Sequence, residues 1–192
     1  MRTRGRSNVM NGTLDLKTGA LREHRQADLI TKLAPVEYDA NATAERWCAF
    51  LDEIMGEGHA LVDFIQRAVG YSMTGKTAEH VLLFLYGLGA NGKTTFLNTL
   101  LEMFGDYGRQ SEPELLMKKR SEAHPTGVAD LKGARLVATS EIEAGRRMDE
   151  SLVKRLTGGD RIKARFMRLD FFEFDPTHTL WLAANHRPVV KG

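Results

Sequence analysis

Apolar residues recur at helical spacing in two segments of the first half of the chain. In residues 47–55 they fall at i, i+3, i+4, i+7 and i+8, and Gly56 follows where a C-terminal cap is expected. Residues 61–69 repeat this spacing and are followed by Gly70. The pattern predicts two consecutive amphipathic helices, each ending at a glycine.

Other segments have the pattern of strands. Alternation on both sides of the tripeptide KTG predicts a small hairpin over residues 13–24. The apolar run VLLFLY at residues 81–86 is typical of a strand buried on both faces. Similar runs at residues 136–138 and 180–183 predict two further strands.

Helical spacing returns soon after the first of these apolar runs. Residues 93–104 keep an apolar face up to Gly105. Strands that alternate with helices favour an α/β fold in which helices flank a parallel sheet. We therefore expect such a domain over residues 80–192, preceded by a small, mainly helical region that includes the hairpin, over residues 1–79.

The phosphate-loop pattern G-x-x-x-x-G-K-[ST] occurs twice, at residues 70–77 and at residues 87–94. The pattern binds phosphate only where a buried strand enters the loop and a helix leaves it. The first match begins at the predicted cap of a helix and leads into a strand, so we interpret it as an ordinary turn. The second match lies between the strand at 81–86 and the helix at 93–104, which predicts a nucleotide site.

The residues of the second match suit phosphate chemistry. Glycines permit the backbone conformations that turn successive N–H groups toward phosphate oxygens. In such loops the lysine, here Lys93, reaches the β- and γ-phosphates, and the hydroxyl of Thr94 binds Mg²⁺. The residues expected to bind the nucleotide are Gly87, Gly89, Ala90, Asn91, Gly92, Lys93, Thr94 and Thr95.

Polar residues follow the two later strands. Glu141 and Glu143 come after one of them, and Asn185 comes after the other. The carboxyl ends of parallel strands meet at one edge, where ligands bind in open α/β folds. An acid there can bind Mg²⁺ or polarise the attacking water, and an amide can orient that water. We expect Glu141 and Asn185 to act beside Lys93, with Glu143 as a further metal ligand and His186 as a structural or surface residue.

A basic segment lies between these strands. Residues 151–159 predict a short helix closed by two glycines, and the sequence DRIKARFMR follows. Its alternation places Ile162, Ala164 and Phe166 on one face and Arg161, Lys163 and Arg165 on the other, and DFFEFDP could form the second arm of a ribbon. The basic face suits either a sheet edge protected by charge or contact with nucleic-acid phosphates.

The composition limits the size of the core, the way nucleic acid could be bound and the cellular setting. The 192 residues, 42% of them hydrophobic, suffice for one core with an appendage. The 27 Lys and Arg against 25 Asp and Glu mean that nucleic acid must be bound by local patches. A single cysteine, Cys48, excludes an internal disulfide, and no apolar run is long enough to span a bilayer. We expect a cytoplasmic protein without a membrane partner.

Taken in order, these segments resemble the superfamily 3 helicase module at the C-terminal end of phage, plasmid and poxvirus-type primase-helicases. Its helical region is matched by NGTLDLKTGAL, VEYDANATAERW and VGYSMTG. Its Walker A motif is matched by GLGANGKTT, Walker B by LKGARLVATSEIEAGRR, the B-prime segment by LTGGDRIKARF, and motif C, or sensor 1, by LWLAANHRP. The matches cover most of the chain in the family's order.

The resemblance implies P-loop NTPase subunits of the AAA+ type that assemble in a ring, expected to be a hexamer. ATP would bind between neighbours, and B-prime hairpins would draw single-stranded DNA through the centre. Lys93 and Thr94 would bind ATP and Mg²⁺, Glu141 would be the Walker B acid and Asn185 the sensor, and Lys163 or Arg165 would meet DNA. The implied function is an ATP-dependent DNA helicase or translocase of a phage or plasmid replication protein, working with a primase domain or other replication proteins.

The sequence departs from the family's pattern in two places. Walker B of many relatives ends in two adjacent acids, whereas Ser140 precedes Glu141 here, so the roles of Glu141 and Glu143 stay open. The family's arginine finger follows motif C, and we expect that segment to lie beyond Gly192. Arg187 is the nearest candidate for a substitute.

Two other functions share the phosphate loop. A nucleoside or small-molecule kinase would need an acceptor pocket and an arginine-rich lid, and the basic ribbon between two core strands argues against it. A nucleotide- and DNA-binding subunit with little turnover would lack only the finger. ATP binding compared with hydrolysis, with and without single-stranded DNA, separates the three.

Overall fold

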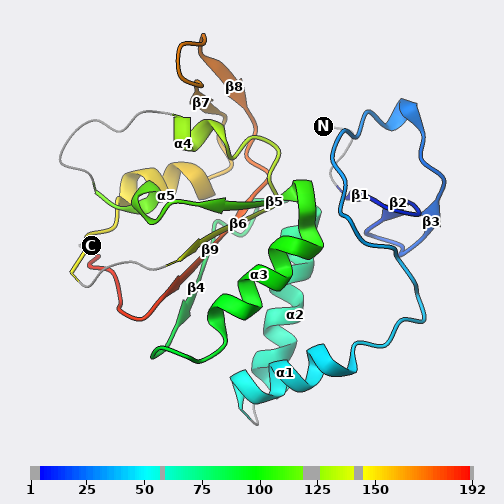
Figure 1. The fold of residues 1–192 in the computed structure, drawn as a ribbon. Coiled ribbons are helices and arrows are strands. Elements are labelled where there is room, and N and C mark those ends of the chain that lie inside the picture. The colour runs from blue at the N-terminus through cyan, green and yellow to red at the C-terminus, as the bar shows by residue number, and fades with distance from the viewer. Residues whose placement is uncertain (1–4, 57–58, 119–125, 141–144, 191–192) are drawn as a thin grey trace.

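The centre of the molecule is a four-stranded parallel sheet with the order β4-β9-β6-β5. Figure 1 shows this computed structural model, which describes residues 5–56, 59–118, 126–140 and 145–190. Helices flank the sheet, so the predicted α/β fold is confirmed. The four strands are β4 (Leu82–Tyr86), β5 (Gly108–Ser111), β6 (Leu136–Ser140) and β9 (Thr179–Ala184).

Helices and short elements cover both faces of the sheet. One face packs against α1 (Glu45–Met55), α2 (His59–Thr74) and α3 (Lys93–Phe104). The other packs against α4 (Thr126–Ala129), α5 (Glu150–Thr157) and the 3₁₀ turn η3 (Pro113–Leu116). No helix within the described ranges is both long and apolar enough to cross a membrane.

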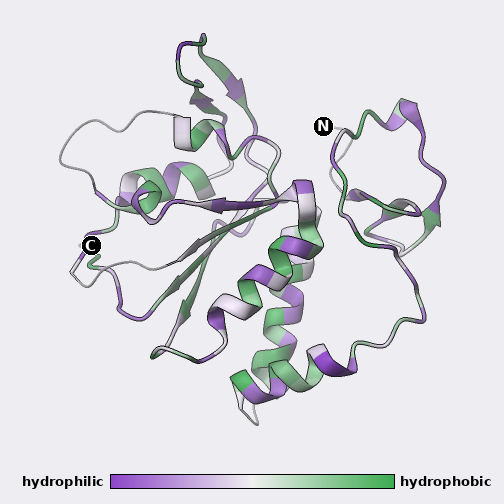
Figure 2. Ribbon diagram, viewed as in Figure 1, coloured by the Kyte–Doolittle hydropathy of each residue, from purple (hydrophilic) through white to green (hydrophobic). Residues whose placement is uncertain are grey.

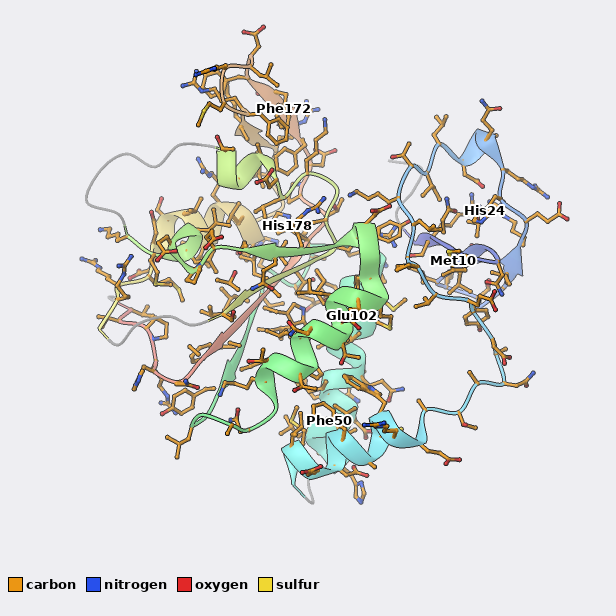
Figure 3. All side chains as sticks on the ribbon, in the orientation of Figure 1. Met10, His24, Phe50, Glu102, Phe172 and His178 are labelled. Carbon is orange, nitrogen blue, oxygen red and sulfur yellow. The ribbon has the colours of Figure 1, made fainter. Side chains whose placement is uncertain are left out.

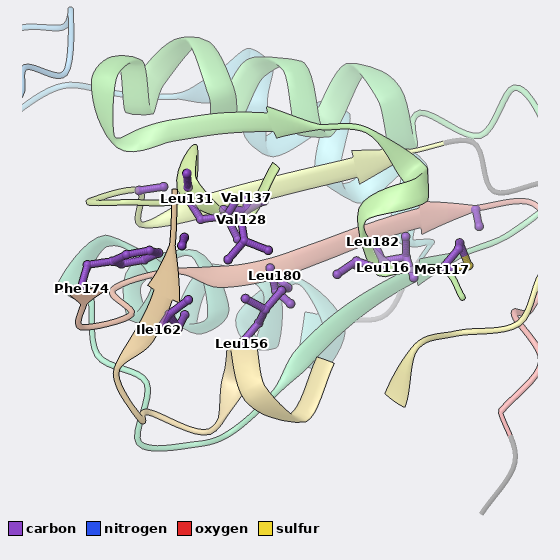
Figure 4. Close-up of a cluster of buried hydrophobic side chains, with 14 residues drawn as sticks. Leu116, Met117, Val128, Leu131, Val137, Leu156, Ile162, Phe174, Leu180 and Leu182 are labelled. Carbon is purple, nitrogen blue, oxygen red and sulfur yellow. The ribbon is translucent and has the colours of Figure 1, made fainter. Parts of the chain in front are cut away.

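Alternation along β9 divides the core into two clusters. Leu180 and Leu182 point into the cluster of Figure 4, together with Leu156 of α5. Trp181 and Ala183 point to the opposite face, among the side chains of α1, α2 and α3. All six residues of β9 are buried, and a fully buried large aliphatic side chain contributes about 1.5 to 3 kcal/mol.

The two edge strands differ in polarity. Figure 2 shows β5 as hydrophilic and β4 as largely hydrophobic. The expectation that residues 81–86 form a strand buried on both faces is wrong: β4 pairs only with β9, its residues 82–85 are half-buried, and Tyr86 is 50% exposed. An apolar run of this length specifies a strand but not its place in the sheet order.

The N-terminal region contains a second, antiparallel sheet. The predicted hairpin is confirmed as β2 (Gly12–Asp15) and β3 (Leu21–Arg22). The Asp15 carboxylate accepts the N–H groups of Lys17 at 3.0 Å and Thr18 at 3.2 Å, which fixes the turn. A strand that the pattern did not predict, β1 (Arg6–Val9), pairs with β2, and the 3₁₀ turn η1 (Gln26–Asp28) follows.

A buried arginine joins this sheet to the parallel sheet. The guanidinium of Arg135 donates to the Ser7 hydroxyl and to the backbone oxygens of Arg6 and Met73, and it lies 4.3 Å from the ring centroid of Tyr107, in the 3₁₀ turn η2 (Gly105–Tyr107). Burial lowers the pKa of Arg135. Buried contacts thus cross the boundary expected between residues 79 and 80, which remains a prediction.

The first phosphate-loop match lies at the end of α2. The helix continues past Gly70 to Thr74, so the predicted stop at Gly70 is wrong. Gly75, with a φ of +68°, follows the helix, and the chain then leads to β4. The order is helix, loop, strand, which is the reverse of a phosphate site, as predicted.

A small hairpin, β7 (Ile162–Ala164) and β8 (Phe172–Phe174), projects from the body of the domain (Figure 1). It follows Gly158 and Gly159 at the end of α5, and it confirms the predicted ribbon. Ile162 and Ala164 are buried as expected. Phe166 departs from that face, because it lies in the turn beyond β7 and is 36% exposed.

Candidate nucleotide-binding site

The second phosphate-loop match has the strand, loop and helix order that the pattern requires. Residues 87–92 connect β4 to α3, and Lys93 is the first residue of that helix. Tyr86 and Ala184 are register partners in β4 and β9, so Gly87 and Asn185 leave the sheet side by side. The parallel pairing therefore brings Asn185 to the loop from a position far along the sequence.

The ammonium group of Lys93 has three N–H donors and four oxygen acceptors within hydrogen-bond distance. The acceptors are the carbonyl oxygens of Gly87 at 2.8 Å and Leu88 at 3.1 Å, Oδ1 of Asn91 at 2.7 Å, and Oδ1 of Asn185 at 3.0 Å. Desolvation lowers the pKa of Lys93. These neutral oxygen acceptors mark a position where phosphate oxygens could replace them.

The loop backbone depends on Gly92 in particular. Gly92 has a φ of +81°, and a Cβ there would lie 2.5 Å from Cγ2 of Ile54. A Cβ on Gly87 would lie 2.2 Å from Nδ2 of Asn91. Ala90 also adopts a left-handed conformation, with a φ of +58°. Helix α1 thus presses against the loop at Gly92 and leaves no room there for a side chain, whereas a Cβ at Gly89 would meet no atom within 4 Å.

A cavity of about 300 Å³ lies beside Lys93 at the carboxyl ends of β6 and β9. The amino end of α3 opens into it, and the first turn of this helix carries no acidic residue. Such a helix end favours anions, because its N–H groups and its dipole point toward them. The residues that line the cavity are Gly89, Ala90, Asn91, Gly92, Lys93, Thr94, Thr95, Ser140, Ala183, Ala184 and Asn185.

The two candidate acids lie outside the described residues. Glu141 and Glu143 fall within residues 141–144, so their expected roles stay predictions. Ser140, the last residue of β6, lines the cavity, and the chain therefore leaves β6 at its wall.

Two polar residues after Asn185 lie at the surface. His186 is exposed, in keeping with the expected surface role. The guanidinium of Arg187 lies 4.8 Å from the ring centroid of Tyr86 in the same chain. This contact holds Arg187 beside its own loop.

The three basic residues predicted to meet DNA lie apart from this cavity, on the β7–β8 hairpin. Arg161 forms ion pairs with Glu173 and Asp175, while Lys163 and Arg165 lie over the ring of Phe171. Sequence reasoning missed Phe171, although the aromatic run DFFEFDP was visible.

The comparisons with known proteins place this site within a family. A model described as a family of unknown function, DUF5906, matches residues 85–191, which is more than half of the chain. The chain belongs to this family. The DUF5906 segment includes the loop, α3 and Asn185, and a separate model described as "D5 N terminal like" matches residues 2–56.

The relatives are longer than this chain. A protein of Acanthamoeba polyphaga mimivirus named "Putative helicase" is 28% identical over 188 residues, which is 95% of this chain and 20% of that protein. Two apo structures of the NrS-1 C-terminal region, both 14% identical, have TM-scores of 0.57 and 0.55 and cover 73% and 72% of this chain. The chain covers 33% and 32% of those structures, and at this identity the likeness concerns the fold.

These findings support a relationship to viral primase-helicase-type proteins. They agree with the broader part of the resemblance drawn from the motifs. Membership of superfamily 3 in particular remains a prediction.

Proposed function

We propose that the chain binds ATP and Mg²⁺ at the loop of residues 87–95 and is the motor part of a superfamily 3 DNA helicase or translocase. The observation that carries the proposal is the 3.0 Å hydrogen bond between Lys93 and Asn185, which joins the ends of two neighbouring parallel strands at the amino end of α3. A cation and an amide at such an edge suit a nucleotide triphosphate.

Each residue has a distinct role in this proposal. Lys93 exchanges its carbonyl partners for β- and γ-phosphate oxygens, and Asn185 is then available to orient the attacking water. The hydroxyl of Thr94 and the carboxylate of Glu141 or Glu143 would hold Mg²⁺. The metal would neutralise charge that develops on the phosphate oxygens.

The helicase part of the proposal rests on other observations. The name of the mimivirus relative and the N-terminal match support it, and the projecting hairpin offers a basic surface away from the nucleotide. We propose single-stranded DNA as the polymer, a ring of subunits, expected to be a hexamer, as the assembly, and a primase domain or other replication proteins as partners. The setting would be the cytoplasm of a bacterial host or a virus-infected cell.

An ATP-binding titration of Lys93→Ala against Lys76→Ala tests the site. Both changes remove one lysine from a phosphate-loop pattern, so they are matched. Loss of a charged hydrogen-bond donor to phosphate should weaken binding by about 10- to 150-fold for Lys93→Ala, whereas Lys76→Ala should bind ATP like the wild type. Equal losses in the two variants would refute the assignment.

Steady-state phosphate release separates the helicase from its alternatives. A motor hydrolyses ATP faster when single-stranded DNA is added. Binding without turnover would favour a nucleotide- and DNA-binding subunit. Phosphate transfer to a small acceptor would indicate a kinase.

A further inference from the structure

The three basic residues on the outer surface of the β7–β8 hairpin have different partners. At the base, the guanidinium of Arg161 lies 3.4 Å from a carboxylate oxygen of Asp175 and 3.6 Å from one of Glu173. Toward the tip, Lys163 Nζ lies 5.2 Å and Arg165 Cζ 4.8 Å from the ring centroid of Phe171. Acidic side chains therefore pair with Arg161, whereas Lys163 and Arg165 lie over an aromatic ring.

The tip also exposes large apolar side chains. Phe171 is 52% exposed, and Met167 and Leu169 are 64% and 61% exposed. Exposed apolar groups gathered in one turn between cations are unusual on a surface without a partner. A solvated, charge-protected sheet edge accounts for the cations but not for these side chains.

The tip is held in place by its own contacts. The N–H of Leu169 donates to the carbonyl oxygen of Phe166 at 3.2 Å, and Arg168 adopts a left-handed φ of +61° in this turn. The ring of Phe166 stacks on that of Phe172 at 5.5 Å, and Phe172, labelled in Figure 3, packs against the core cluster. The turn therefore projects from the domain but is held in a defined position by these contacts.

Charged residues of both signs lie near the hairpin, and Lys163 and Arg165 are the cations around Phe171. Phe171 and Lys163 also line a cavity of about 880 Å³ against β5 and α5. Its other basic residues, Arg109 and Arg155, are accompanied by the acidic residues Glu112, Asp130 and Asp149. Lys163 lies opposite Glu173 in the β7–β8 register, and Asp170 precedes Phe171, so acidic residues also flank this end of the hairpin. Among the described residues the hairpin's ion pairs involve Arg161, and none involves Lys163 or Arg165.

We propose that Phe171 stacks against an unpaired base of single-stranded nucleic acid, while Lys163 and Arg165 hold the phosphates on either side. Every base has a face that can stack on an aromatic ring, and cations beside the ring suit the backbone. The phosphates would draw the two cations off the ring and leave its face to the base. Bases in a duplex are already stacked, so the tip would distinguish single strands. The inference rests on the DNA-binding part of the proposed function and assigns no such contact to Arg161.

A pair of probes tests this contact. We would measure binding of a dye-labelled oligothymidine and of an abasic single strand of equal length, which has the same phosphates without bases. Phe171→Leu should weaken oligothymidine binding by about 5- to 150-fold, as expected for one lost stacking contact, and leave abasic binding unchanged. Phe171→Trp should retain binding, and Phe64→Leu, on a phenylalanine that is 48% exposed on α2, should change neither probe.

The cations give the complementary result. The double variant Lys163→Gln with Arg165→Gln should weaken both probes and reduce the slope of log affinity against log salt by about 1.4, since each phosphate contact on a single strand contributes about 0.7. Arg161→Gln should alter neither probe.

Three outcomes would overturn the inference. Wild-type affinity of Phe171→Leu for oligothymidine, together with weakened binding by the double variant, would reject stacking and leave the proposed DNA binding intact. Failure of the wild type to bind either probe while it binds ATP would reject DNA binding as well. If Phe171→Leu altered only self-association in light scattering, the tip would be a contact between subunits.

Discussion

The two segments that share the phosphate-loop pattern, residues 70–77 and 87–94, differ in what surrounds them. Both place a glycine with positive φ before the lysine, +68° at Gly75 and +81° at Gly92. Lys76 is exposed and its ammonium group has no partner among the described residues, whereas that of Lys93 has four oxygen acceptors within hydrogen-bond distance. The pattern specifies a local turn, and a site requires in addition the neighbouring strand that supplies Asn185.

The largest effect should be on ATP turnover, when the acid expected to act beside the second segment is replaced. Glu141→Gln should lower ATP turnover by about 10²- to 10⁴-fold while ATP binding stays near wild type, because the amide keeps the shape but loses the charge that acts on water or metal. Phosphate release measures the turnover. If Glu143→Gln were inactive and Glu141→Gln active, the roles assigned to Glu141 and Glu143 would have to be exchanged.

Replacing the matching glycines by alanine should destabilise the protein by different amounts in the two segments. Gly75→Ala should cost only the left-handed conformation, about 1 to 2 kcal/mol, because its Cβ would meet Thr177 at an ordinary 3.5 Å. Gly92→Ala adds the clash with Ile54 and should cost about 2 to 5 kcal/mol in urea unfolding. Equal losses would mean that α1 does not confine the second loop.

The buried side chain of His178, just before β9, should make the stability of the protein depend on pH. His178 is 3% exposed, neither ring nitrogen has a hydrogen-bond partner among the described residues, and desolvation lowers its pKa to about 4. The nearby backbone of Leu156 favours the charged ring, but desolvation is the larger cause.

The sign of the pH effect follows from that lowered pKa. Above pH 6.5 the ring is neutral in both states and the full stability is present. As pH falls from 6.5 toward 4, the unfolded chain gains a proton that the folded one excludes, so stability should fall by up to about 3 kcal/mol. Urea unfolding at several pH values should show this loss in the wild type and a smaller one in His178→Asn. Identical pH profiles would exclude His178 as the cause.

The smallest effect should be a gain in stability when Gly70, the first glycine of the first segment, is replaced. Gly70 lies inside α2, and a Cβ there would meet no atom within 4 Å. Gly70→Ala should therefore stabilise the protein by about 0.5 to 1 kcal/mol, since alanine loses less freedom in a helix. A lower melting temperature would argue that the segment needs a turn at this glycine.

Local periodicity predicted α1, α2, α3 and α5, the two hairpins and the strand, loop and helix order, because each of these depends on residues near one another. It misplaced the end of α2, where Ser72 is held beyond Gly70 by bonds to Ala68 and to Trp181 on β9. It also could not place β4 at the edge, because strand order depends on which chain segments pair. Asn185 could be foreseen from the rule for parallel strands, whereas Phe171 gains its two cations only when the hairpin closes.

Arg135 has a consequence for how such proteins can be recombined. The two family models divide the chain between residues 56 and 85, as if the parts were exchangeable modules. The acceptors of Arg135 in the N-terminal match are the hydroxyl of Ser7 and the backbone oxygen of Arg6, so a replaced N-terminal part must supply both. Without them a buried cation loses two of its hydrogen bonds, each worth about 1.5 to 3 kcal/mol, which is a large share of the stability of an ordinary domain. The two parts are therefore expected to be inherited together.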